Sequence, residues 1–405
     1  MSWARGFLYL AQLASIERRS PMPENPYLNV ALMALFTAVF IVACSYGLGG
    51  VARWIVRKRG GTPKFQQNTF AGYFFAAPWI IGFFIFVLVP LGFSFYWSLT
   101  DYSIASKEPP NWKGFENYRT ILFEDDGFRA SILNTLYLTV IGLPLQMAAA
   151  LFLAVLLNQK MKGEKIFRMA FYLPVILGFN TAVLLCWRLM LNAGTGIINQ
   201  IIRALSGAFL PFQYLNRGFI YIQEIIAAFF LGLNTGKYNL LLNVLEAGFP
   251  ADNRVPLWVQ SPLWTKMSVI LLMVWGCGAM MLIFLAGLNN IPKELHEAAE
   301  VDGATGWQKF WKISFPLLTP YVFYNLVVGL IASLQIFEPI FVLYRDNQPI
   351  VSSTISMVYY LWQKTFSHFE IGYGSALSWV ILIIILIVTL IQFRLQDRWV
   401  TYDVY

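Results

Sequence analysis

Seven long apolar runs constrain the fold of this chain more than any other feature. They cover residues 30–52, 72–99, 131–157, 166–191, 263–288, 316–343 and 375–395. Each is close to the roughly 20 residues that a helix needs to cross the hydrocarbon core of a bilayer. The runs are continuous and do not alternate with polar residues, so they predict helices and not a β-barrel. The charged content of 12% is also below the roughly 25% of soluble domains. We therefore expect an all-α polytopic membrane protein.

The basic residues give a formal net charge of +8 and also predict the orientation of the chain. They lie beside the apolar runs and form no patch with interleaved aromatic residues, so we expect the lipid bilayer and no nucleic acid as a partner. One set of loops carries 14 Lys and Arg in roughly 67 residues, and the opposite set carries 13 in roughly 160. Because Lys and Arg prefer the cytoplasmic side, the first set, with residues 289–315, is predicted to be cytoplasmic. The N-terminus is then outside and the C-terminus inside.

The cysteines and the first apolar run predict no covalent framework and no cleaved signal. Cys44, Cys186 and Cys277 all lie inside apolar runs, where a free cysteine behaves as a small hydrophobic residue. Neither a disulfide framework nor a metal site is expected from them. The run 30–52 is too long for a signal peptide and lacks a convincing cleavage site, so it is predicted to be a membrane anchor.

Two outer segments leave alternatives open. Residues 100–130 are polar and aromatic, and they are equally compatible with a surface for a soluble partner and with a solvated connector. Residues 192–262 are apolar but interrupted by charged residues, and the run 219–233 within them is too short to span without tilt. We favour helices that lie at the outer interface or cap the bundle, with a re-entrant hairpin as the alternative.

Residues 289–320 form a polar, amphipathic island between two apolar runs. Pro292 suits the first turn of a helix, because its missing N–H is harmless there. The following segment KELHEAAEVD can run helically until Gly303, which can take the left-handed conformation that closes a helix. Thr305, with Gln308 three residues on, predicts a capping box. The island is therefore predicted to hold two short helices.

The second predicted helix is amphipathic, and the first carries small and acidic side chains. Trp307, Phe310 and Trp311 have the spacing of a single helical face, and Pro316 is predicted to begin the next span. Ala298 and Ala299 permit close approach of a partner's backbone. An ordinary cytoplasmic loop with two surface helices explains these features about as well.

A longer pattern resembles a known family. Glu297-Ala298-Ala299, three residues, Gly303, nine residues, Ile313, two residues and Pro316 resemble the EAA loop of ABC importer permeases. The segment EAAEVDGATGWQKFWKISFPLL is most similar to the carbohydrate-uptake branch, the maltose and glycerol-phosphate type. The resemblance covers about residues 70–398, through segments 123–158, 167–199, 281–292, 334–343 and 369–379.

The resemblance implies a domain organisation. Residues 70–398 would form the six-helix core of a type I ABC importer permease. Residues 1–69 would add an extra N-terminal transmembrane helix at 30–52, and residues of about 205–261 an outer insertion. The cytoplasmic coupling loop would span 289–316. The protein would lie in the cell (inner) membrane of a prokaryote.

The same resemblance implies the partners and the coupling residues. The EAA loop would sit in a cleft of an ABC ATPase dimer, and ATP and Mg²⁺ would bind to that partner. This chain has no G-x-x-x-x-G-K-[ST] phosphate loop, so it is expected to be no enzyme and to hold no cofactor of its own. A second homologous permease, either a different chain or a second copy, and an extracytoplasmic solute-binding protein complete the expected assembly. The expected coupling residues are Glu297, Ala298, Ala299, Asp302, Gly303, Ile313 and Pro316.

Charged and polar residues inside the runs are candidates for the translocation path. Arg188 and Glu338 are predicted to lie at similar depth in the fourth and sixth runs and to form an ion pair, although Arg188 could instead reach the interface. Two polar segments are further candidates, because by resemblance they line the path of sugar permeases. They contain Gly178, Asn180 and Thr181, and Ser333, Gln335, Phe337 and Glu338. For each polar residue alone, hydrogen bonding between helices is the simpler explanation.

These observations together predict a permease subunit of a binding-protein-dependent ABC importer for a sugar or related polyol. An ion-coupled secondary transporter is one alternative, and a non-transporting accessory membrane subunit is another. The sequence does not name the solute.

Overall fold

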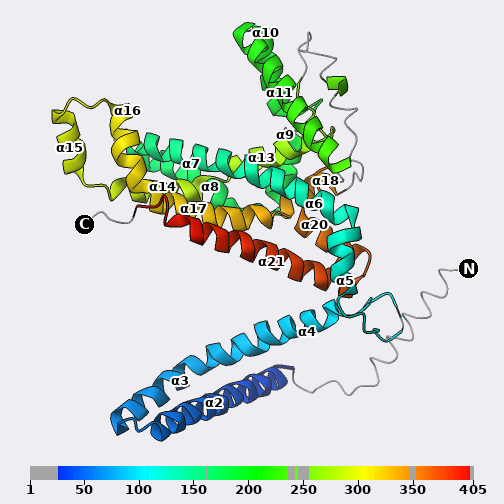
Figure 1. Cartoon of the computed structure of the whole chain (residues 1–405), viewed down its shortest axis with the longest axis vertical. Helices are drawn as coiled ribbons and strands as arrows, with labels where there is room; N and C mark the ends of the chain where they lie inside the picture. The colour runs from blue at the N-terminus through cyan, green and yellow to red at the C-terminus, as the bar shows by residue number, and fades with distance from the viewer. Residues whose placement is uncertain are drawn as a thin grey trace, which may run out of the picture. The chain divides into compact units, whose positions relative to one another are not determined.

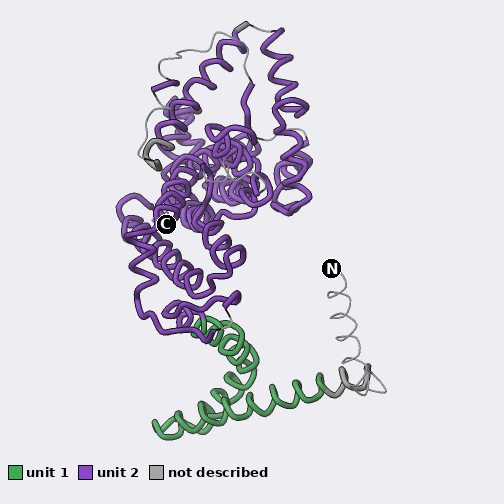
Figure 2. Tube along the Cα trace, turned by 90° about the vertical axis from the view of Figure 1, so that its right-hand side faces the viewer, with its two compact units in different colours: residues 1–93 green, residues 94–405 purple. Residues whose placement is uncertain are grey.

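The computed structural model describes residues 26–106, 108–159, 163–208, 210–235, 242–244, 255–345 and 353–401. Within these ranges the regular structure is helical, with one isolated β-bridge between Thr100 and Trp112 (Figure 1). The contacts between residues divide the chain into two units, 1–93 and 94–405 (Figure 2). That division falls inside the second predicted run, so a core that begins at residue 70 stays a prediction.

The α-helices are α2 (Pro26–Lys58), α3 (Pro63–Phe83), α4 (Val89–Ser98), α5 (Glu116–Arg119), α6 (Asp126–Tyr137), α7 (Leu143–Asn158), α8 (Glu164–Leu177), α9 (Thr181–Met190), α10 (Ile197–Ala208), α11 (Leu210–Thr235), α13 (Thr265–Trp275), α14 (Gly278–Asn289), α15 (Lys293–Val301), α16 (Gly306–Lys309), α17 (Phe315–Leu334), α18 (Glu338–Tyr344), α20 (Met357–Trp362) and α21 (Ile371–Gln396). The π-helical turns are η1 (Phe84–Leu88), η2 (Thr120–Glu124), η3 (Leu138–Gly142), η4 (Phe310–Ser314) and η5 (Gln363–Ser367).

All seven predicted runs have a counterpart among these helices. Five segments are long and apolar enough to span a membrane: Leu35–Lys58, Pro63–Ser98, Asp126–Asn158, Gly306–Tyr344 and Ile371–Gln396. Two further pairs pass the same test together, but each pair is bent. Thr265–Trp275 and Gly278–Asn289 meet at 43°, and Lys165–Leu177 and Thr181–Met190 meet at 111°. The structure therefore corrects the expectation of one straight helix over 166–191.

Prolines explain why three of the π turns occur where they do. The helices that follow η1, η3 and η4 each have proline as their second residue, namely Pro90, Pro144 and Pro316. A proline has no N–H to donate, and its ring clashes with the carbonyl four residues earlier. One wider turn with i→i+5 bonds accommodates the ring without ending the helix. At η4, for example, the N–H of Phe315 donates to the carbonyl of Phe310.

The first unit contains a hairpin of two apolar helices, α2 and α3. Pro63 begins α3, and the hydroxyl of Thr62 accepts a hydrogen bond of 3.4 Å from the N–H of Phe65. Gly49 allows the two helices to approach, because a Cβ atom there would lie 2.9 Å from the ring of Phe70. Most large apolar side chains of the hairpin are exposed, as expected for a surface that faces lipid.

One of the buried clusters of the second unit lies where α7, α14 and α17 pack together, and a larger one joins α6, α13, α18, α20 and α21. Ala150, Phe284 and Leu318 are fully buried in the first of these clusters. Gly287 brings α14 against α17, since a Cβ atom at this position would lie 2.7 Å from Leu318 and Tyr321. Small residues at such crossings permit the close helix packing that is typical of membrane proteins. α21 also packs on α17, so the last run completes this bundle.

In the described part of the stretch 192–262, the long helices α10 and α11 make buried contacts with other parts of the second unit. The ring of Phe230 lies 4.6 Å from that of Tyr137 on α6. Asn199 is buried, donates to the carbonyl of Pro256 at 3.0 Å and accepts from the indole of Trp258 at 2.9 Å. Neither helix is among the candidate spans. Residues 236–241 and 245–254 of the predicted insertion lie outside the described residues.

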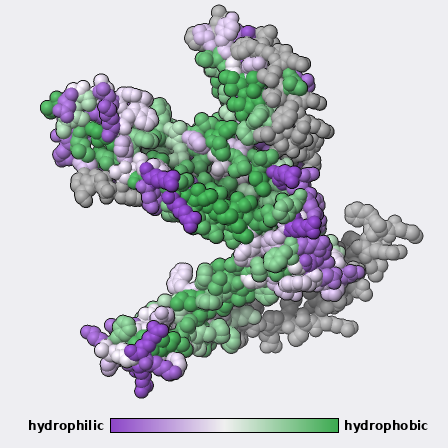
Figure 3. Space-filling model, viewed as in Figure 1, coloured by the Kyte–Doolittle hydropathy of each residue, from purple (hydrophilic) through white to green (hydrophobic). Residues whose placement is uncertain are grey.

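Hydrophobic residues cover most of the visible surface of the helical bundle, and hydrophilic residues gather around α15 and α16 at one end and around α5 at the other (Figure 3). This distribution suits a bundle whose two ends face water while its middle faces lipid. The candidate sites below lie at these ends and at the interruptions of the helices between them.

Candidate coupling and translocation sites

The predicted cytoplasmic island folds as a hairpin, here called the coupling hairpin (residues 290–316). Its first arm is α15, which begins after Pro292 and ends at Val301. Gly303 has a φ of +77°, and the N–H of Ala304 donates to the carbonyl of Ala299 at 2.9 Å. The predicted left-handed turn at Gly303 is therefore confirmed.

The predicted capping box at the start of the second arm is also confirmed. The N–H of Thr305 donates to Oε1 of Gln308 at 2.8 Å, and the N–H of Gln308 donates to Oγ1 of Thr305 at 3.4 Å. Trp307, Phe310 and Trp311 share one face, with ring centroids 5.3 to 6.5 Å apart.

The second arm does not end before the next span, contrary to the prediction that Pro316 starts a new helix. α16, η4 and α17 follow one another without a gap from Gly306 to Leu334. The π turn absorbs the proline, and the helix continues. As a result, the second arm of the hairpin is a direct extension of a membrane-spanning helix.

The tip of the hairpin is the part that a partner can reach. Glu297, Ala298 and Asp302 are exposed, and Val301 is 88% exposed. Leu295, also on α15, is 42% exposed. Small, acidic and apolar side chains on one short helix make a surface that fits a cleft with apolar walls and a basic rim. The pattern search singled out neither Leu295 nor Val301, although an apolar residue in a polar segment is a readable signal.

The other predicted coupling residues are less exposed. Ala299, Ile313 and Pro316 are only partly exposed. Ile313 belongs to η4, and Pro316 is the residue that makes η4 necessary. The structure thus divides the predicted set into residues of α15 and its turn, which include Ala299, and residues of the joint between the hairpin and α17, which are Ile313 and Pro316.

An ion pair joins the two arms of the hairpin. Nζ of Lys309 lies 2.5 Å from Oε1 of Glu300, and the side chain of Lys309 is only 19% exposed. The hydrogen bond from Lys309, and then its charge, lower the pKa of Glu300. The sequence reasoning missed this pair, because nine residues and a turn separate its members.

The break between α8 and α9 places two predicted path residues in a sharp turn. Gly178 has a φ of +64° and a ψ of 176°, a conformation that is essentially reserved for glycine. The amide of Asn180 donates to the carbonyl of Leu177 at 2.9 Å and accepts from the N–H of Val183 at 3.0 Å, so it caps α9. Asn180 and Thr181 are exposed.

A second interruption separates α17 from α18. Gln335 and Glu338 are exposed there, Phe337 is half-buried, and Ser333 is buried with its hydroxyl donating to the carbonyl of Leu330 at 2.9 Å. Ser333 is therefore satisfied within its own helix. α18 packs against α9, so the elements that carry the two predicted polar segments are neighbours.

Arg188 and Glu338 lie on these two neighbouring helices. Arg188 is on α9 and is half-buried, and Glu338 is the first residue of α18. Because α9 packs against α18, the two side chains lie on neighbouring helices, and the ion pair between them stays a prediction.

Aromatic rings gather beside the second interruption. Phe337 stacks on Phe341 with centroids 5.2 Å apart, and Trp362 meets Phe341 edge-on at 4.7 Å. Tyr359 and Phe366 lie 5.9 and 6.4 Å from Trp362. We call these five residues the aromatic cluster. The predicted set contained only Phe337, although the i, i+4 spacing of Phe337 with Phe341 and of Trp362 with Phe366 was visible in the sequence.

Comparison with known proteins decides the family. The model of the family described as "Binding-protein-dependent transport system inner membrane component" matches residues 126–401. The chain belongs to this family of transport permeases.

Individual relatives agree with that assignment. The permease is 35% identical to the probable ABC transporter permease protein YesP of Bacillus subtilis over 338 residues. The match covers 84% of this chain and 94% of YesP. It is 30% identical to the arabinooligosaccharides transport system permease protein AraP of the same organism, over 84% of this chain and 93% of AraP. Both are named as transport permeases, and the family is one of inner-membrane components.

Solved structures share the fold. A chain in the crystal structure of a bacterial ABC transporter for the acidic polysaccharide alginate has a TM-score of 0.62 and 24% identity, and the match covers 83% of this chain and 98% of that one. The same transporter in complex with an alginate pentasaccharide-bound periplasmic protein gives a TM-score of 0.61 at 22% identity, over 83% and 96% of the two chains. The predicted fold class, an ABC importer permease, is confirmed.

Proposed function

We propose that this permease forms the translocation path of an ABC importer for a sugar or related polyol. It would work with a second homologous permease, an ABC ATPase dimer and an extracytoplasmic solute-binding protein. The observation that carries the proposal is the coupling hairpin. Its tip is exposed, and its second arm continues without interruption into a membrane-spanning helix.

The continuity of the second arm supplies a mechanism for coupling. A force on the tip of α15 passes through the Gly303 turn and the Lys309–Glu300 pair into α16, and from there through η4 into α17. α17 ends at Leu334, next to the interruption that carries Gln335 and Glu338. Movement at the hairpin would thus reach the candidate path along one helix.

ATP chemistry would belong to the partner. This chain lacks the phosphate-loop sequence, and the acidic and small residues at the hairpin tip suit a docked ATPase. ATP and Mg²⁺ would bind to the ATPase dimer, and the chain itself would catalyse no reaction. This arrangement requires the hairpin and the C-terminus to be cytoplasmic and the N-terminus to be outside, as the distribution of Lys and Arg predicts.

A sugar or polyol suits the chemistry of the interruptions. Such solutes present hydroxyl groups and apolar ring faces, and the described path segments offer amides, a carboxylate and partly exposed aromatic rings. Gln335 and Glu338 lie beside the aromatic cluster, and Asn180 lies on the neighbouring α8–α9 turn. The name of AraP, an arabinooligosaccharide permease, supports the same solute class.

Reconstitution of the assembled importer in liposomes tests the proposal. Uptake of a labelled sugar should require ATP on the ATPase side and the solute-binding protein on the other side. The control is the same liposomes with an ATPase variant that binds but does not hydrolyse ATP. Uptake that an ion gradient drives without ATP would favour a secondary transporter, and assembly without any uptake would favour an accessory subunit; either result contradicts the proposal.

A further inference from the structure

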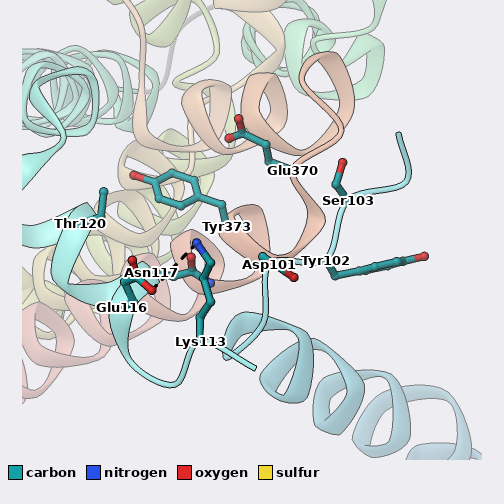
Figure 4. A pocket seen from close by; sticks show the side chains of 9 residues that line it. All are labelled: Asp101, Tyr102, Ser103, Lys113, Glu116, Asn117, Thr120, Glu370 and Tyr373. Carbon is teal, nitrogen blue, oxygen red and sulfur yellow. Dashed lines mark ion pairs between the residues drawn. The ribbon is translucent and has the colours of Figure 1, made fainter. Parts of the chain in front are cut away.

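A polar pocket of about 290 Å³ lies in the second unit, between the segment 101–120 and the start of α21. Figure 4 shows its walls: Asp101, Lys113, Glu116 and Asn117 come from the first segment, and Glu370 and Tyr373 come from the second. We call it the outer pocket. Neither the proposed path nor the coupling hairpin uses any of these residues.

Hydrogen bonds hold the walls of the outer pocket in place. The buried amide of Asn117 donates to the carbonyls of Ser98 and Thr100, each at 2.9 Å. The N–H of Gly372 donates to the carbonyl of Tyr102 at 2.8 Å, which ties the start of α21 to the loop. Gly372 is required for this approach, because a Cβ atom there would lie 2.3 Å from the carbonyl oxygen of Thr100.

A partly buried carboxylate, that of Asp125, fixes the second wall more firmly. The hydroxyl of Tyr373 donates to Asp125, and that of Tyr360 donates to both oxygens of Asp125, at 2.8 and 2.7 Å. Asp125 also accepts from the N–H of Phe128 at 3.0 Å and so caps α6. The pocket is thus organised before any partner arrives, which lowers the entropic cost of binding.

The outer pocket is acidic, and its carboxylates are accessible to solvent. Three carboxylates line it, those of Asp101, Glu116 and Glu370, against the single ammonium group of Lys113. Glu116 is 62% exposed and lies only at the outer limit of an ion pair with Lys113, at 4.0 Å. Glu370 is 45% exposed and lies 3.4 Å from Lys364. Hydrogen bonds from Asn111 lower the pKa of Asp101, so this carboxyl stays ionised at neutral pH.

Two exposed aromatic residues flank lining residues of the pocket in the sequence. They are Trp112 and Phe115, which are 63% and 71% exposed. Exposed aromatic residues around a charged, preorganised pocket are typical of interface hot spots. A cationic side chain is the group that complements three carboxylates.

We propose that the outer pocket receives a lysine or arginine side chain of the solute-binding protein when that protein docks on the permease. This inference rests on the proposed function and orientation, which put segment 101–120 outside. It specifies which permease residues make the contact, whereas the proposed function requires only that a binding protein docks somewhere on the outer face.

The test uses the complete importer in lipid nanodiscs and the solute-binding protein that stimulates its ATPase. Glu116→Gln together with Glu370→Gln should weaken the association of that protein on the order of tenfold, mainly through a slower on-rate. The salt dependence of association should also become shallower. ATPase activity without the binding protein should stay unchanged.

Two control variants separate this contact from general electrostatics and from misfolding. Glu124→Gln with Asp126→Asn removes the same charge from exposed positions that do not line the pocket, and it should weaken association less than twofold. Lys113→Gln makes the pocket more acidic and should tighten association. A damaged fold would not tighten binding.

Three results would overturn the inference while leaving the proposed function intact. These are unchanged association in the Gln variant, an equal loss in the control variant, or normal association with lost uptake, which would mean that the pocket holds the solute. If no binding protein stimulates the importer, the proposed function itself fails.

Discussion

The two ends of α17 differ: the helix continues past one of them and is interrupted at the other. At its N-terminal end, the π turn η4 lets the helix continue through Pro316 into the coupling hairpin. At its C-terminal end, the helix stops at Leu334 and restarts at Glu338. The same contrast separates η4 from the break at Gly178, where α8 and α9 meet at 111°. The helix is continuous at η4, where the coupling hairpin would transmit force, and it is broken at the two interruptions where polar side chains are exposed.

The contrast teaches how one chain can combine a rigid joint with an open turn. A proline in a π turn keeps the helix continuous, because the backbone groups it leaves are bonded one residue further along. A glycine with positive φ ends the helix and exposes the neighbouring polar side chains. Four experiments, from the largest expected effect to the smallest, would break or sharpen this comparison.

Gly303→Asp should uncouple the hairpin. A side chain at a φ of +77° strains the turn between the two arms, though Asp tolerates this conformation better than most residues, and the new carboxylate alters the surface that the ATPase would contact. We expect uptake to fall more than tenfold while ATP hydrolysis continues. Gly306→Ala is the matched control, because Gly306 begins the second arm with ordinary φ and open space around it. Wild-type uptake by Gly303→Asp would count against the coupling assignment.

Gly178→Ala should destabilise the break between α8 and α9. The φ of +64° and ψ of 176° at this position cost a residue with a Cβ about 1–3 kcal/mol. Thermal unfolding in detergent should show a lower midpoint, together with lower uptake. Gly207→Ala in α10, where no heavy atom lies within 4 Å of the added Cβ, should instead stabilise the protein by about 0.5–1 kcal/mol. Equal stability of the two variants would remove the strained turn from the comparison.

Arg188→Ala and Glu338→Ala should show non-additive losses of uptake. If the two side chains pair, the double variant should differ from the sum of the single variants by about 0.5 kcal/mol or more, which is roughly a twofold change in rate. A parallel cycle of Arg188 with Glu124, which pairs with Arg119 at 3.5 Å, should be additive. Strict additivity in the first cycle would end the ion-pair hypothesis.

Lys309→Gln should give the smallest effect. The pair with Glu300 connects the two arms, but Glu300 is 64% exposed, and such surface pairs contribute about 0–1 kcal/mol. We expect uptake to fall by less than about twofold, with a smaller difference from wild type at high salt. Lys312→Gln, at an exposed position on η4, is the control. A loss equal to that of Gly303→Asp would show that the hairpin depends on the ion pair more than on the turn.

Local rules predicted the coupling hairpin well. The turn at Gly303 and the capping box of Thr305 and Gln308 depend on residues within five positions of one another, so the local sequence contains all the interacting groups. The same holds for the seven apolar runs, because length and hydropathy suffice to define a candidate span. The continuity through Pro316 was missed, since a proline also commonly begins a new helix, and the sequence does not show that a π turn accommodates this one.

The long-range features could not be predicted from neighbours in sequence. The aromatic cluster joins Phe337 to Trp362, and the outer pocket joins Asp101 to Glu370; each pair is distant along the chain. Lys266 is the clearest case. Its position at the edge of an apolar run suggests an interfacial cation, yet it is 1% exposed, and its Nζ lies 5.4 Å from the ring of Tyr137. Nothing in the residues around position 266 announces that burial.

The sequence by itself determined that this chain is a helical membrane protein, where its candidate spans lie, which segment forms the coupling hairpin and to which family it belongs. Those properties follow from hydropathy and from short-range backbone chemistry. The tertiary structure alone decided that α8 and α9 bend at Gly178, that the hairpin continues into α17, and that carboxylates from 101–116 and 370 share one pocket. These outcomes depend on packing and hydrogen bonds between segments far apart in the chain, whose energies no local pattern contains.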